Sequence, residues 1–222
     1  MIRALASAAV VALIVSTGQA LGQAASKERE VADVKPDLAR AQQIATKVCA
    51  ACHAVDGNSP ASANPKLAGQ LREYLHKQLV NFKAAEGKKA ARDNPVMGSM
   101  LANLNDADLK SLAAYFAEQK LKPALARDKD LAAKGRALWR GGNLQSGVPA
   151  CAGCHGAAGI GMPASYPRLG GQFAEYIEAQ LKAFRTEART NDTNGVMRGV
   201  TQRMTDAEMR AVADYAAGLR AD

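Results

Sequence analysis

The sequence predicts an all-α fold of two tandem domains related by internal duplication. A CxxCH motif occurs twice, at Cys49–His53 and Cys151–His155, and the two copies lie 102 residues apart. Between the motifs, apolar residues recur at intervals of three and four, as they do in amphipathic helices. No segment shows the regular apolar and polar alternation of a half-buried strand. These observations favour helices throughout, with one motif in each domain.

The repeat extends beyond the motif. The offset of 102 residues also aligns Pro65–Gln70 with Pro167–Gln172. From Met97 and Met197 onward the offset is 100, because two residues are missing from the second copy after Phe184. A repeat of this length predicts two homologous domains. The first offset further aligns four helix positions, Tyr74, Gln78, Leu79 and Phe82 with Tyr176, Gln180, Leu181 and Phe184.

A helix is expected before each motif, at 38–47 and at 130–140. The first helix runs into Cys49, whereas Gly141 and Gly142 end the second one, and a loop to Pro149 follows. After each motif comes a loop and then an amphipathic helix. Its apolar stripe is formed by Leu71, Leu75, Leu79 and Phe82 in the first copy and by Phe173, Ile177, Leu181 and Phe184 in the second.

Each domain is expected to end with a long irregular segment followed by a closing helix. The segments span 84–104 and 186–204, and loops of this length usually bind something. Thr205–Glu208 is a capping box, and Asn105–Asp108 is a weaker version of it. The first closing helix ends near Lys120, and Pro123 then interrupts the pattern. We therefore place the domains at 25–122 and 123–222.

Residues 1–24 have the pattern of a secretory signal peptide. Arg3 gives a positive start, residues 4–17 are an uncharged apolar run, and Ala20 or Ala24 ends a small-residue cleavage site. The alternative is an uncleaved anchor, but the run is shorter than the roughly 20 residues that a spanning helix needs. We expect cleavage near Ala24 and export, with the mature protein soluble or peripherally attached to a membrane.

The composition limits the classes of partner and suggests a cofactor. The formal charge is +8, and without Arg3 the mature chain keeps +7. Export excludes nucleic acid as a partner, and a cationic surface steers a protein toward acidic proteins or anionic lipid. Aromatic residues make up only 5% of the chain, which is low for filling two cores of this size. A buried haem would supply the missing apolar surface.

The CxxCH motif predicts covalent haem attachment through two thioethers, with the adjacent histidine on the iron. Two cysteines three residues apart on a helical turn face the same side and reach one edge of a porphyrin. A double CxxC zinc site would separate its halves by about 15 to 20 residues, and a redox CxxC would lie near a strand–helix–strand unit. We therefore expect two haems c, attached at Cys49 and Cys52 and at Cys151 and Cys154, with His53 and His155 on the irons.

The residue on the other side of each iron decides between electron transfer and chemistry at an open iron. Met97 and Met197 are equivalent in the repeat, so we expect them to be the sixth ligands. The other candidates have no methionine counterpart: Met100, Met162, Met204 and Met209. Pro65 and Pro167 either accept a hydrogen bond from the histidine ring or are ordinary turn prolines. We expect His76 on a solvated helix face and Trp139 in packing.

Taken together, the motifs resemble those of the dihaem cytochromes c4, which are built from two class I cytochrome c domains. The resemblance covers essentially the whole mature chain, and the region around Lys88 and Lys89 before Met97 is longer than the family pattern. The motifs that carry it are Cys49-Ala-Ala-Cys-His53-Ala-Val-Asp-Gly-Asn-Ser-Pro60, Pro65-Lys-Leu-Ala-Gly-Gln70, Arg140-Gly-Gly, Cys151-Ala-Gly-Cys-His155, Pro167-Arg-Leu-Gly-Gly-Gln172 and Met197-Arg-Gly-Val200.

The resemblance implies His/Met ligation of both irons and haems that face each other across a pseudo-two-fold interface. It also implies a periplasmic role, carrying electrons from a quinol-oxidising complex of the quinol–cytochrome c reductase type toward a terminal oxidase or reductase. On this interpretation the protein is not an enzyme. Two alternatives remain: a dihaem peroxidase-like enzyme with one open iron, and a fixed haem subunit of a larger oxidoreductase.

Overall fold

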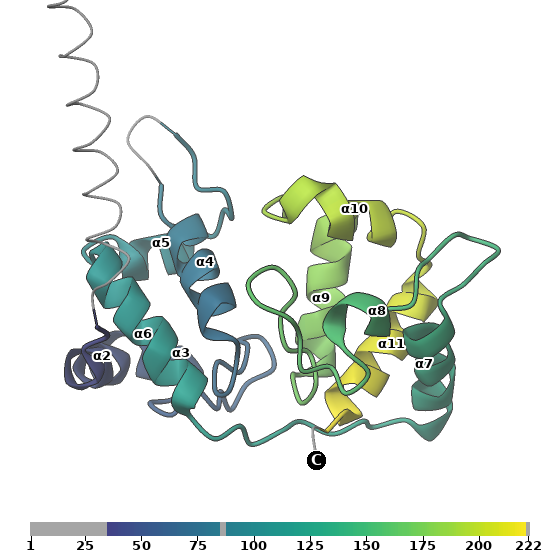
Figure 1. The fold of residues 1–222 in the computed structure, drawn as a ribbon, viewed down its shortest axis with the longest axis horizontal. Helices are drawn as coiled ribbons and strands as arrows, with labels where there is room; N and C mark the ends of the chain where they lie inside the picture. The colour runs from purple at the N-terminus through teal and green to yellow at the C-terminus, as the bar shows by residue number, and fades with distance from the viewer. Residues whose placement is uncertain (1–34, 85–87, 221–222) are drawn as a thin grey trace, which may run out of the picture. The chain divides into compact units, whose positions relative to one another are not determined.

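The computed structural model describes residues 35–84 and 88–220, and the chain from Asp37 onward forms one compact unit (Figure 1). The predicted signal peptide lies outside the described residues. Within the described ranges, no helix has both the length and the hydrophobicity that a membrane span requires. We refer to residues 37–122 as the first half and to residues 123–220 as the second half.

In the first half, the helix predicted before the motif is confirmed, and it continues through the motif without a loop. The connection is a π-helical turn, a local widening of the helix that is frequent at functional sites. The elements of this half are α2 (Leu38–Ile44), the π-helical turn η1 (Ala45–Cys49), α3 (Ala50–His53), α4 (Arg72–Phe82), α5 (Pro95–Leu101) and α6 (Asp106–Glu118).

In the second half, the helix before the motif ends at Gly141, as predicted, and a loop leads to the motif. Gly142 has φ +69°, and a Cβ there would lie 2.3 Å from the carbonyl oxygen of Val148, so only glycine fits. The elements of this half are α7 (Lys129–Gly141), α8 (Ala152–His155), α9 (Ala174–Arg185), the 3₁₀ turn η2 (Thr193–Gly195), α10 (Val196–Thr201) and α11 (Asp206–Gly218).

The all-α prediction is confirmed for the described residues. Their β-structure is limited to isolated bridge residues, among them Asn143 paired with Val148 and Met162 paired with Tyr166. Both closing helices begin at capping boxes, and the weaker one also makes both of its bonds: Asn105 accepts from the backbone of Asp108, whose carboxylate accepts from the backbone of Asn105.

The prediction of irregular segments at 84–104 and 186–204 is wrong in part, because each contains a short helix. Met97 lies in α5 and Met197 lies in α10. The side chain of Asn94 accepts a hydrogen bond from the backbone of Met97 at 3.0 Å, and Pro95 occupies the first turn. Helices of six or seven residues are too short to show a periodic apolar pattern, so the sequence analysis missed them.

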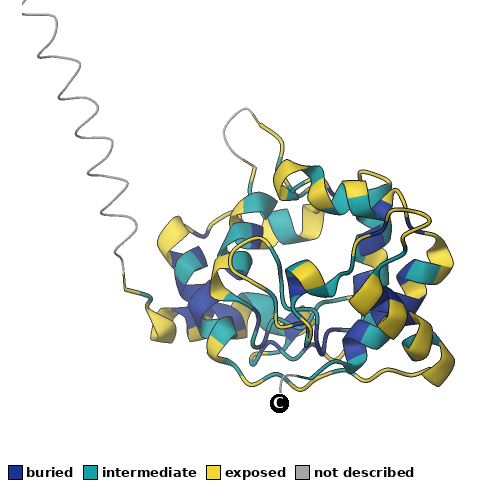
Figure 2. Ribbon diagram, turned by 45° about the vertical axis from the view of Figure 1, so that its right-hand side comes forward, coloured by how far each residue is buried: buried dark blue, intermediate teal, exposed yellow. Residues whose placement is uncertain are grey.

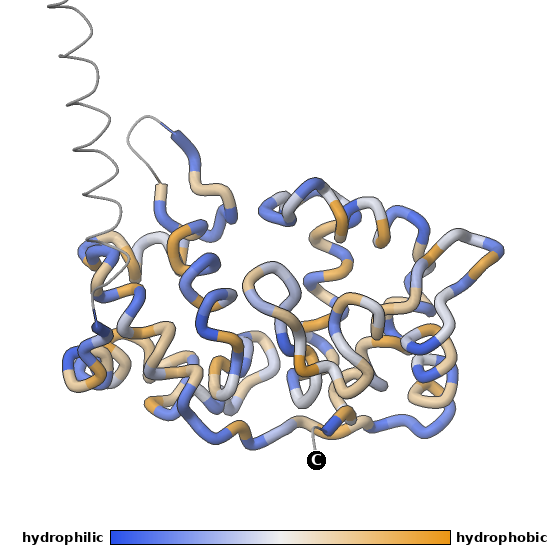
Figure 3. The backbone as a smooth tube through the Cα atoms, in the orientation of Figure 1, coloured by the Kyte–Doolittle hydropathy of each residue, from blue (hydrophilic) through white to orange (hydrophobic). Residues whose placement is uncertain are grey.

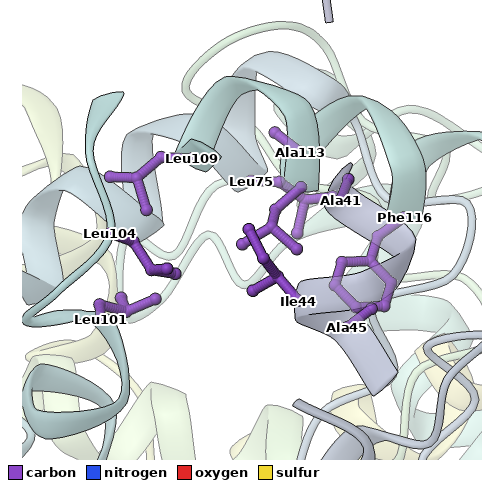
Figure 4. Close-up of a cluster of buried hydrophobic side chains, with 10 residues drawn as sticks. Ala41, Ile44, Ala45, Leu75, Leu101, Leu104, Leu109, Ala113 and Phe116 are labelled. Carbon is purple, nitrogen blue, oxygen red and sulfur yellow. The ribbon is translucent and has the colours of Figure 1, made fainter. Parts of the chain in front are cut away.

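Each half has its own hydrophobic core, centred on its closing helix. In the first half α6 packs against α2 and α4, and in the second half α11 packs against α7 and α9. Leu112 and Trp139 are each 1% exposed. Hydrophobic and hydrophilic residues alternate along these helices (Figure 3), and buried and exposed residues alternate around them (Figure 2). Figure 4 shows the core of the first half, which includes Ala41, Ile44, Ala45, Leu75, Leu101, Leu104, Leu109, Ala113 and Phe116.

Candidate functional site

A cavity of about 790 Å³ is lined by side chains from both halves of the molecule. Both motif histidines line it, together with Cys49 and Cys52, and so do Met97 and Met197. Cys151 precedes the first residue of α8, and Cys154 lies within that helix. Both are half-buried, and neither lines this cavity. Six of the eight side chains predicted for the two sites therefore lie around one space.

Each motif histidine is buried and oriented by a backbone carbonyl. His53 and His155 are both 6% exposed, and their Nδ1 atoms lie 2.9 and 3.0 Å from the carbonyl oxygens of Pro65 and Pro167. A carbonyl only accepts, so each Nδ1 carries the proton and donates. The interpretation of these prolines as hydrogen-bond acceptors is therefore confirmed over that of ordinary turn prolines.

The second nitrogen of each ring is left as a lone-pair donor for a metal. Burial lowers the pKa of His53 and of His155, while the bond to the proline carbonyl opposes this shift, so both rings are neutral at pH 7. The Nε2 atom of His155 is buried and has no hydrogen-bond partner in the described part of the chain. Buried polar atoms are rarely left unpaired, and iron coordination at Nε2 would satisfy this one.

Cys49 and Cys151 do not have the character of zinc ligands or of redox thiols. Burial raises the pKa of Cys49 and of Cys151 to about 11, so both stay protonated at neutral pH. Zinc binding and disulfide exchange both need the thiolate form. Among the described residues, no group of three or more His, Cys, Asp or Glu side chains converges to hold a metal ion. Covalent attachment of a porphyrin consumes the thiols and does not depend on this thiolate stability.

Most of the other methionines considered as the sixth iron ligand do not line the cavity. Met97 and Met197 line it and pack against the cores of their own halves. Met204 and Met209 are 5% and 0% exposed within the second core, so they are occupied by packing. Met100 also lines the cavity and is 47% exposed, so geometry alone does not distinguish it from Met97.

Two further residues singled out from the sequence lie where expected. The indole of Trp139 is buried in the second core and donates from Nε1 to the carbonyl oxygen of Ala157 at 3.2 Å. Its ring centroid lies 6.3 Å from that of His155, so it also packs beside the histidine. His76 is on α4, where its Nε2 lies 2.9 Å from a carboxylate oxygen of Asp106. It takes no part in the cavity.

Sequence reasoning missed a pair of arginines that line the cavity, Arg92 and Arg189. The guanidinium of Arg92 lies 4.6 Å from the ring centroid of Phe82, and that of Arg189 lies 4.5 Å from that of Phe184. Phe82 and Phe184 are equivalent in the repeat. The two arginines therefore occupy equivalent places, each stacked on the last aromatic residue of the post-motif helix.

The hydrogen bonds of the two arginines cross between the halves. Both guanidiniums donate to Gln78 Oε1, at 2.8 Å from Arg92 and 3.1 Å from Arg189, and both donate to Gln180 Oε1 at 2.8 Å. Each also donates to a tyrosine hydroxyl of the opposite half. The distances are 3.0 Å from Arg92 to Tyr176 and 2.9 Å from Arg189 to Tyr74.

The arginine equivalence corrects the sequence alignment. The backbone nitrogens of Arg92 and Arg189 donate to the carbonyl oxygens of Asn81 and Ala183, which are 102 residues apart, whereas the arginines are 97 apart. The second copy is thus five residues shorter before the arginine and three residues longer after it. An offset of 100 at Met197 hides both changes. An arginine in each copy between the phenylalanine and the methionine was the available signal.

The arginine pair makes the cavity electropositive. Among the described residues, neither guanidinium forms an ion pair with a carboxylate, and Arg189 is only 7% exposed. Burial raises the pKa of the Tyr74 hydroxyl, but the charges of Arg189 and Arg92 outweigh it, so this pKa lies below its ordinary value. Buried charges are normally paired. The cavity therefore suits a large apolar group that carries carboxylates.

The sequence was compared with known proteins. A family model described as cytochrome c matches residues 38–120 and 132–219. The cytochrome c4 of Pseudomonas aeruginosa is 44% identical over 183 residues, covering 82% of this chain and 88% of that protein. The chain belongs to the cytochrome c4 family. The crystal structure of reduced recombinant cytochrome c4 from Pseudomonas stutzeri is similar to this cytochrome with a TM-score of 0.76 and 43% identity, over 84% of this chain and 100% of that chain. A thiosulfate dehydrogenase electron acceptor of Thiomonas intermedia is 42% identical over 172 residues, covering 76% of this chain and 77% of that protein.

Cytochromes c4 are dihaem c-type proteins, and this cytochrome accordingly binds two haems c covalently. Its residues fit that cofactor. The two cysteine pairs lie next to buried neutral histidines. Among the described residues, Nε2 of His155 lacks a partner, and the cavity combines apolar walls with two guanidiniums that have no carboxylate partner. A haem has an apolar ring, an iron that takes imidazole nitrogen, and two carboxylates at one edge. Each of these parts therefore finds a matching group in the structure.

Proposed function

We propose that this cytochrome carries electrons in the periplasm, from a quinol-oxidising respiratory complex to a terminal oxidase or reductase, and catalyses no reaction of its own. The observation that carries the proposal is the repeated arrangement of a buried neutral histidine, held through Nδ1 by a proline carbonyl, on a cavity that an equivalent methionine also lines. Two closed irons suit electron transfer, whereas catalysis needs an open coordination position.

The residue assignments of this proposal follow the repeat. Thioether bonds attach one haem at Cys49 and Cys52 and the other at Cys151 and Cys154. The axial ligands are His53 and Met97 for the first iron and His155 and Met197 for the second. When bound, each haem supplies a one-electron ferrous–ferric couple.

The chain contributes orientation, burial and charge. The proline carbonyls fix the histidine rings and raise the basicity of their free nitrogens, which favours coordination. Apolar walls exclude water, so little solvent has to reorganise when the charge of the site changes. Arg92 and Arg189 would offset the carboxylates of the haems at the boundary between the halves. Together these features favour rapid transfer with the ligands unchanged.

The compartment and the domain limits are part of the same proposal. Residues 1–24 resemble an export signal, which would deliver the chain to the periplasm. The domain limits 25–122 and 123–222 are compatible with the two matched segments, 38–120 and 132–219. The cationic surface of the mature chain would favour partners that present acidic faces.

A thiosulfate dehydrogenase is a second candidate for the electron donor. The relative from Thiomonas intermedia is named as an electron acceptor of thiosulfate dehydrogenase, so a thiosulfate dehydrogenase is an alternative to the quinol-oxidising complex as electron donor. Stopped-flow reduction of the purified cytochrome by each donor distinguishes them. We expect the quinol-oxidising complex to reduce the cytochrome faster. Faster reduction by thiosulfate dehydrogenase would instead assign the cytochrome a role in sulfur oxidation.

Ligand binding tests the proposal against a peroxidase-like enzyme. The purified native cytochrome is titrated with cyanide when oxidised and with carbon monoxide when reduced, and its haem content is measured. We expect two haems per chain and no rapid stoichiometric binding of either ligand. Fast binding of one equivalent would reveal an open iron and support the enzyme instead. Isolation only as part of a stable complex would support a fixed subunit.

A further inference from the structure

Two glutamines of the repeat, Gln70 and Gln172, each reach into the opposite half of the molecule. Gln70 donates from Nε2 to the carbonyl oxygen of Arg168 at 2.9 Å, and its Oε1 accepts from the backbone nitrogen of Arg168 at 2.8 Å. Gln172 makes the same pair of bonds with Lys66, at 2.9 and 3.0 Å. Each side-chain amide thus pairs with both backbone groups of one residue across the boundary.

The orientation of these amides is fixed by a third bond. Oε1 of Gln70 also accepts from the backbone nitrogen of Leu71 at 3.0 Å, and Oε1 of Gln172 accepts from that of Phe173 at 3.0 Å. A flipped amide would face two donors with its own NH₂ group and would lose all three bonds. Gln70 and Gln172 are 8% and 7% exposed, so water would not replace them.

The peptide group that each glutamine binds is the one that holds the opposite histidine. Pro65 C=O and Lys66 N–H belong to the same peptide unit. That unit accepts from Nδ1 of His53 at 2.9 Å and donates to Oε1 of Gln172. In the same way, the peptide unit between Pro167 and Arg168 links His155 to Gln70. Hydrogen bonds in a chain polarise one another, so the bond at the N–H strengthens the carbonyl as an acceptor.

We propose that Gln172 is a positioning residue for His53 and that Gln70 is one for His155, so that each half tunes the axial histidine of the other. The inference rests on the proposed function, because it assumes that both histidines bind iron. A strong bond from Nδ1–H makes the imidazole more electron-donating, which stabilises the ferric state. Loss of the glutamine bond weakens this effect and raises the potential of the haem in the opposite half.

The competing explanation is that the glutamines only hold the halves together. Gln70→Met and Gln172→Met are matched variants for this question, because each removes two bonds across the same boundary and keeps the length of the side chain. General loosening would therefore change the two haems in the same way in both variants. Crossed tuning predicts that the identity of the affected haem switches between them.

The experiment uses the holoprotein labelled with ¹⁵N-histidine, and redox titration is followed by NMR so that each haem is measured separately. We expect Gln172→Met to raise the potential of the haem bound by His53 and to shift the Nδ1–H resonance of His53, with the other haem unchanged. Gln70→Met is expected to do the same to the haem bound by His155. A shift confined to the haem of the substituted half, or the same pattern in both variants, would overturn the inference.

A second pair of variants keeps the test decisive if a methionine variant loses haem. Gln70→Glu and Gln172→Glu retain an acceptor oxygen for the backbone N–H and lose the bond that the glutamine donates. We expect the Nδ1–H resonance of the opposite histidine to stay near its native position, and a large displacement would contradict the role of the oxygen. The NMR spectra also show which residues bind iron. If His53 or His155 is not a ligand, the proposed function fails; if both are ligands and the crossed shift is absent, only the tuning fails.

Discussion

The two halves reach their haem motifs by different routes and surround the cavity with the same contacts. In the first half the helix passes through the π-helical turn Ala45–Cys49 directly into the motif. In the second half α7 stops at Gly141, and a loop closed by the bridge between Asn143 and Val148 intervenes. The routes share no type of turn, although both bring the motif histidine to the wall of the cavity.

Around the cavity, by contrast, four contacts of one half recur in the other. The histidine–proline bond, the glutamine bridge, the arginine stacked on phenylalanine and the arginine–tyrosine bond each occur twice. These four contacts around the cavity are therefore matched, while the connecting chain differs. The cavity therefore requires particular side-chain contacts, whereas the backbone can reach the motif by more than one path.

The largest expected effect comes from removing Met97 or Met197, because each variant should change the haem of one half only. We expect Met97→Ala to open the first iron and Met197→Ala to open the second, because each removes the thioether that raises the potential and blocks ligands. The potential of the affected haem should fall by on the order of 0.1–0.3 V, a fraction of the roughly 0.8 V that axial ligands span. Optical redox titration and carbon monoxide binding measure both effects.

The controls are the neighbouring methionines. Met100→Ala removes the exposed methionine that also lines the cavity, and Met204→Ala removes one from the second core. Neither should open an iron, although Met204→Ala should lower the free energy of unfolding by roughly 2–5 kcal/mol through the space it leaves. An opened iron in Met100→Ala would move the first-half ligand from residue 97 to residue 100.

A smaller effect tests whether each arginine of the pair influences the haems of both halves. Arg92→Met and Arg189→Met should each lower the potentials of both haems, because each guanidinium contacts Gln78 and Gln180 and its positive charge favours the reduced state of the site. We also expect each to lower the free energy of unfolding by roughly 1–3 kcal/mol, since acceptors are left unpaired. Redox titration and urea unfolding measure the two quantities.

Arg203→Met is the matched control for this prediction. It removes the same charge, but Arg203 is exposed and its guanidinium donates to the carbonyl oxygen of Gly147 within the second half. Its effect on stability should stay within about 0.5 kcal/mol. If Arg92→Met changed only the first haem, the cross-half bonds to Tyr176 and Gln180 would not couple the sites.

The fold could be predicted from the sequence wherever a signal is local and repeated. The two CxxCH motifs, the apolar stripes of α4 and α9 and the capping box at Thr205 each depend on a few neighbouring residues. They predicted the all-α duplication and placed the helices correctly to within a few residues. The Pro65 and Pro167 carbonyls could also be proposed, because a histidine on a metal usually donates its second N–H to such a group.

What the sequence did not predict depends on contacts between distant segments. Short helices such as α5 and α10 bury too few residues to leave a periodic pattern. Arg92 and Arg189 are separated by 97 residues. Their equivalence is concealed because the second copy is shorter before the arginine and longer after it. Gln70 and Gln172 were visible as repeated residues, but their partners lie across the boundary between the halves, and no local spacing indicates such a pairing.

The smallest effect concerns the side chains that accept a hydrogen bond from the first turn of each methionine-bearing helix. In the first half neutral Asn94 accepts from the backbone of Met97, whereas in the second half the carboxylate of Asp192 accepts from the backbone nitrogen and Nε of Arg198, at 3.0 and 2.9 Å. Burial raises the pKa of Asp192, but these bonds outweigh it, so this pKa lies below the ordinary value of 3.8. The carboxylate therefore stabilises the folded state above pH 3.8, and this contribution is lost as the pH falls through the lower folded pKa.

Asp192→Asn gives the second half an uncharged acceptor like Asn94 of the first. We expect it to lower the free energy of unfolding by roughly 1 kcal/mol at pH 7, because a charged hydrogen bond becomes a neutral one. The difference from the native protein should shrink steadily as the pH drops below 3.8, since this carboxyl is then protonated in the unfolded chain and, below its lower folded pKa, in the native protein as well. Urea unfolding at a series of pH values measures it, with Asn94→Asp placing the charge in the first half instead. A difference that stayed constant down to pH 2 would mean that Asp192 acts through the shape of the turn and not through its charge, and the two acceptors would then be equivalent.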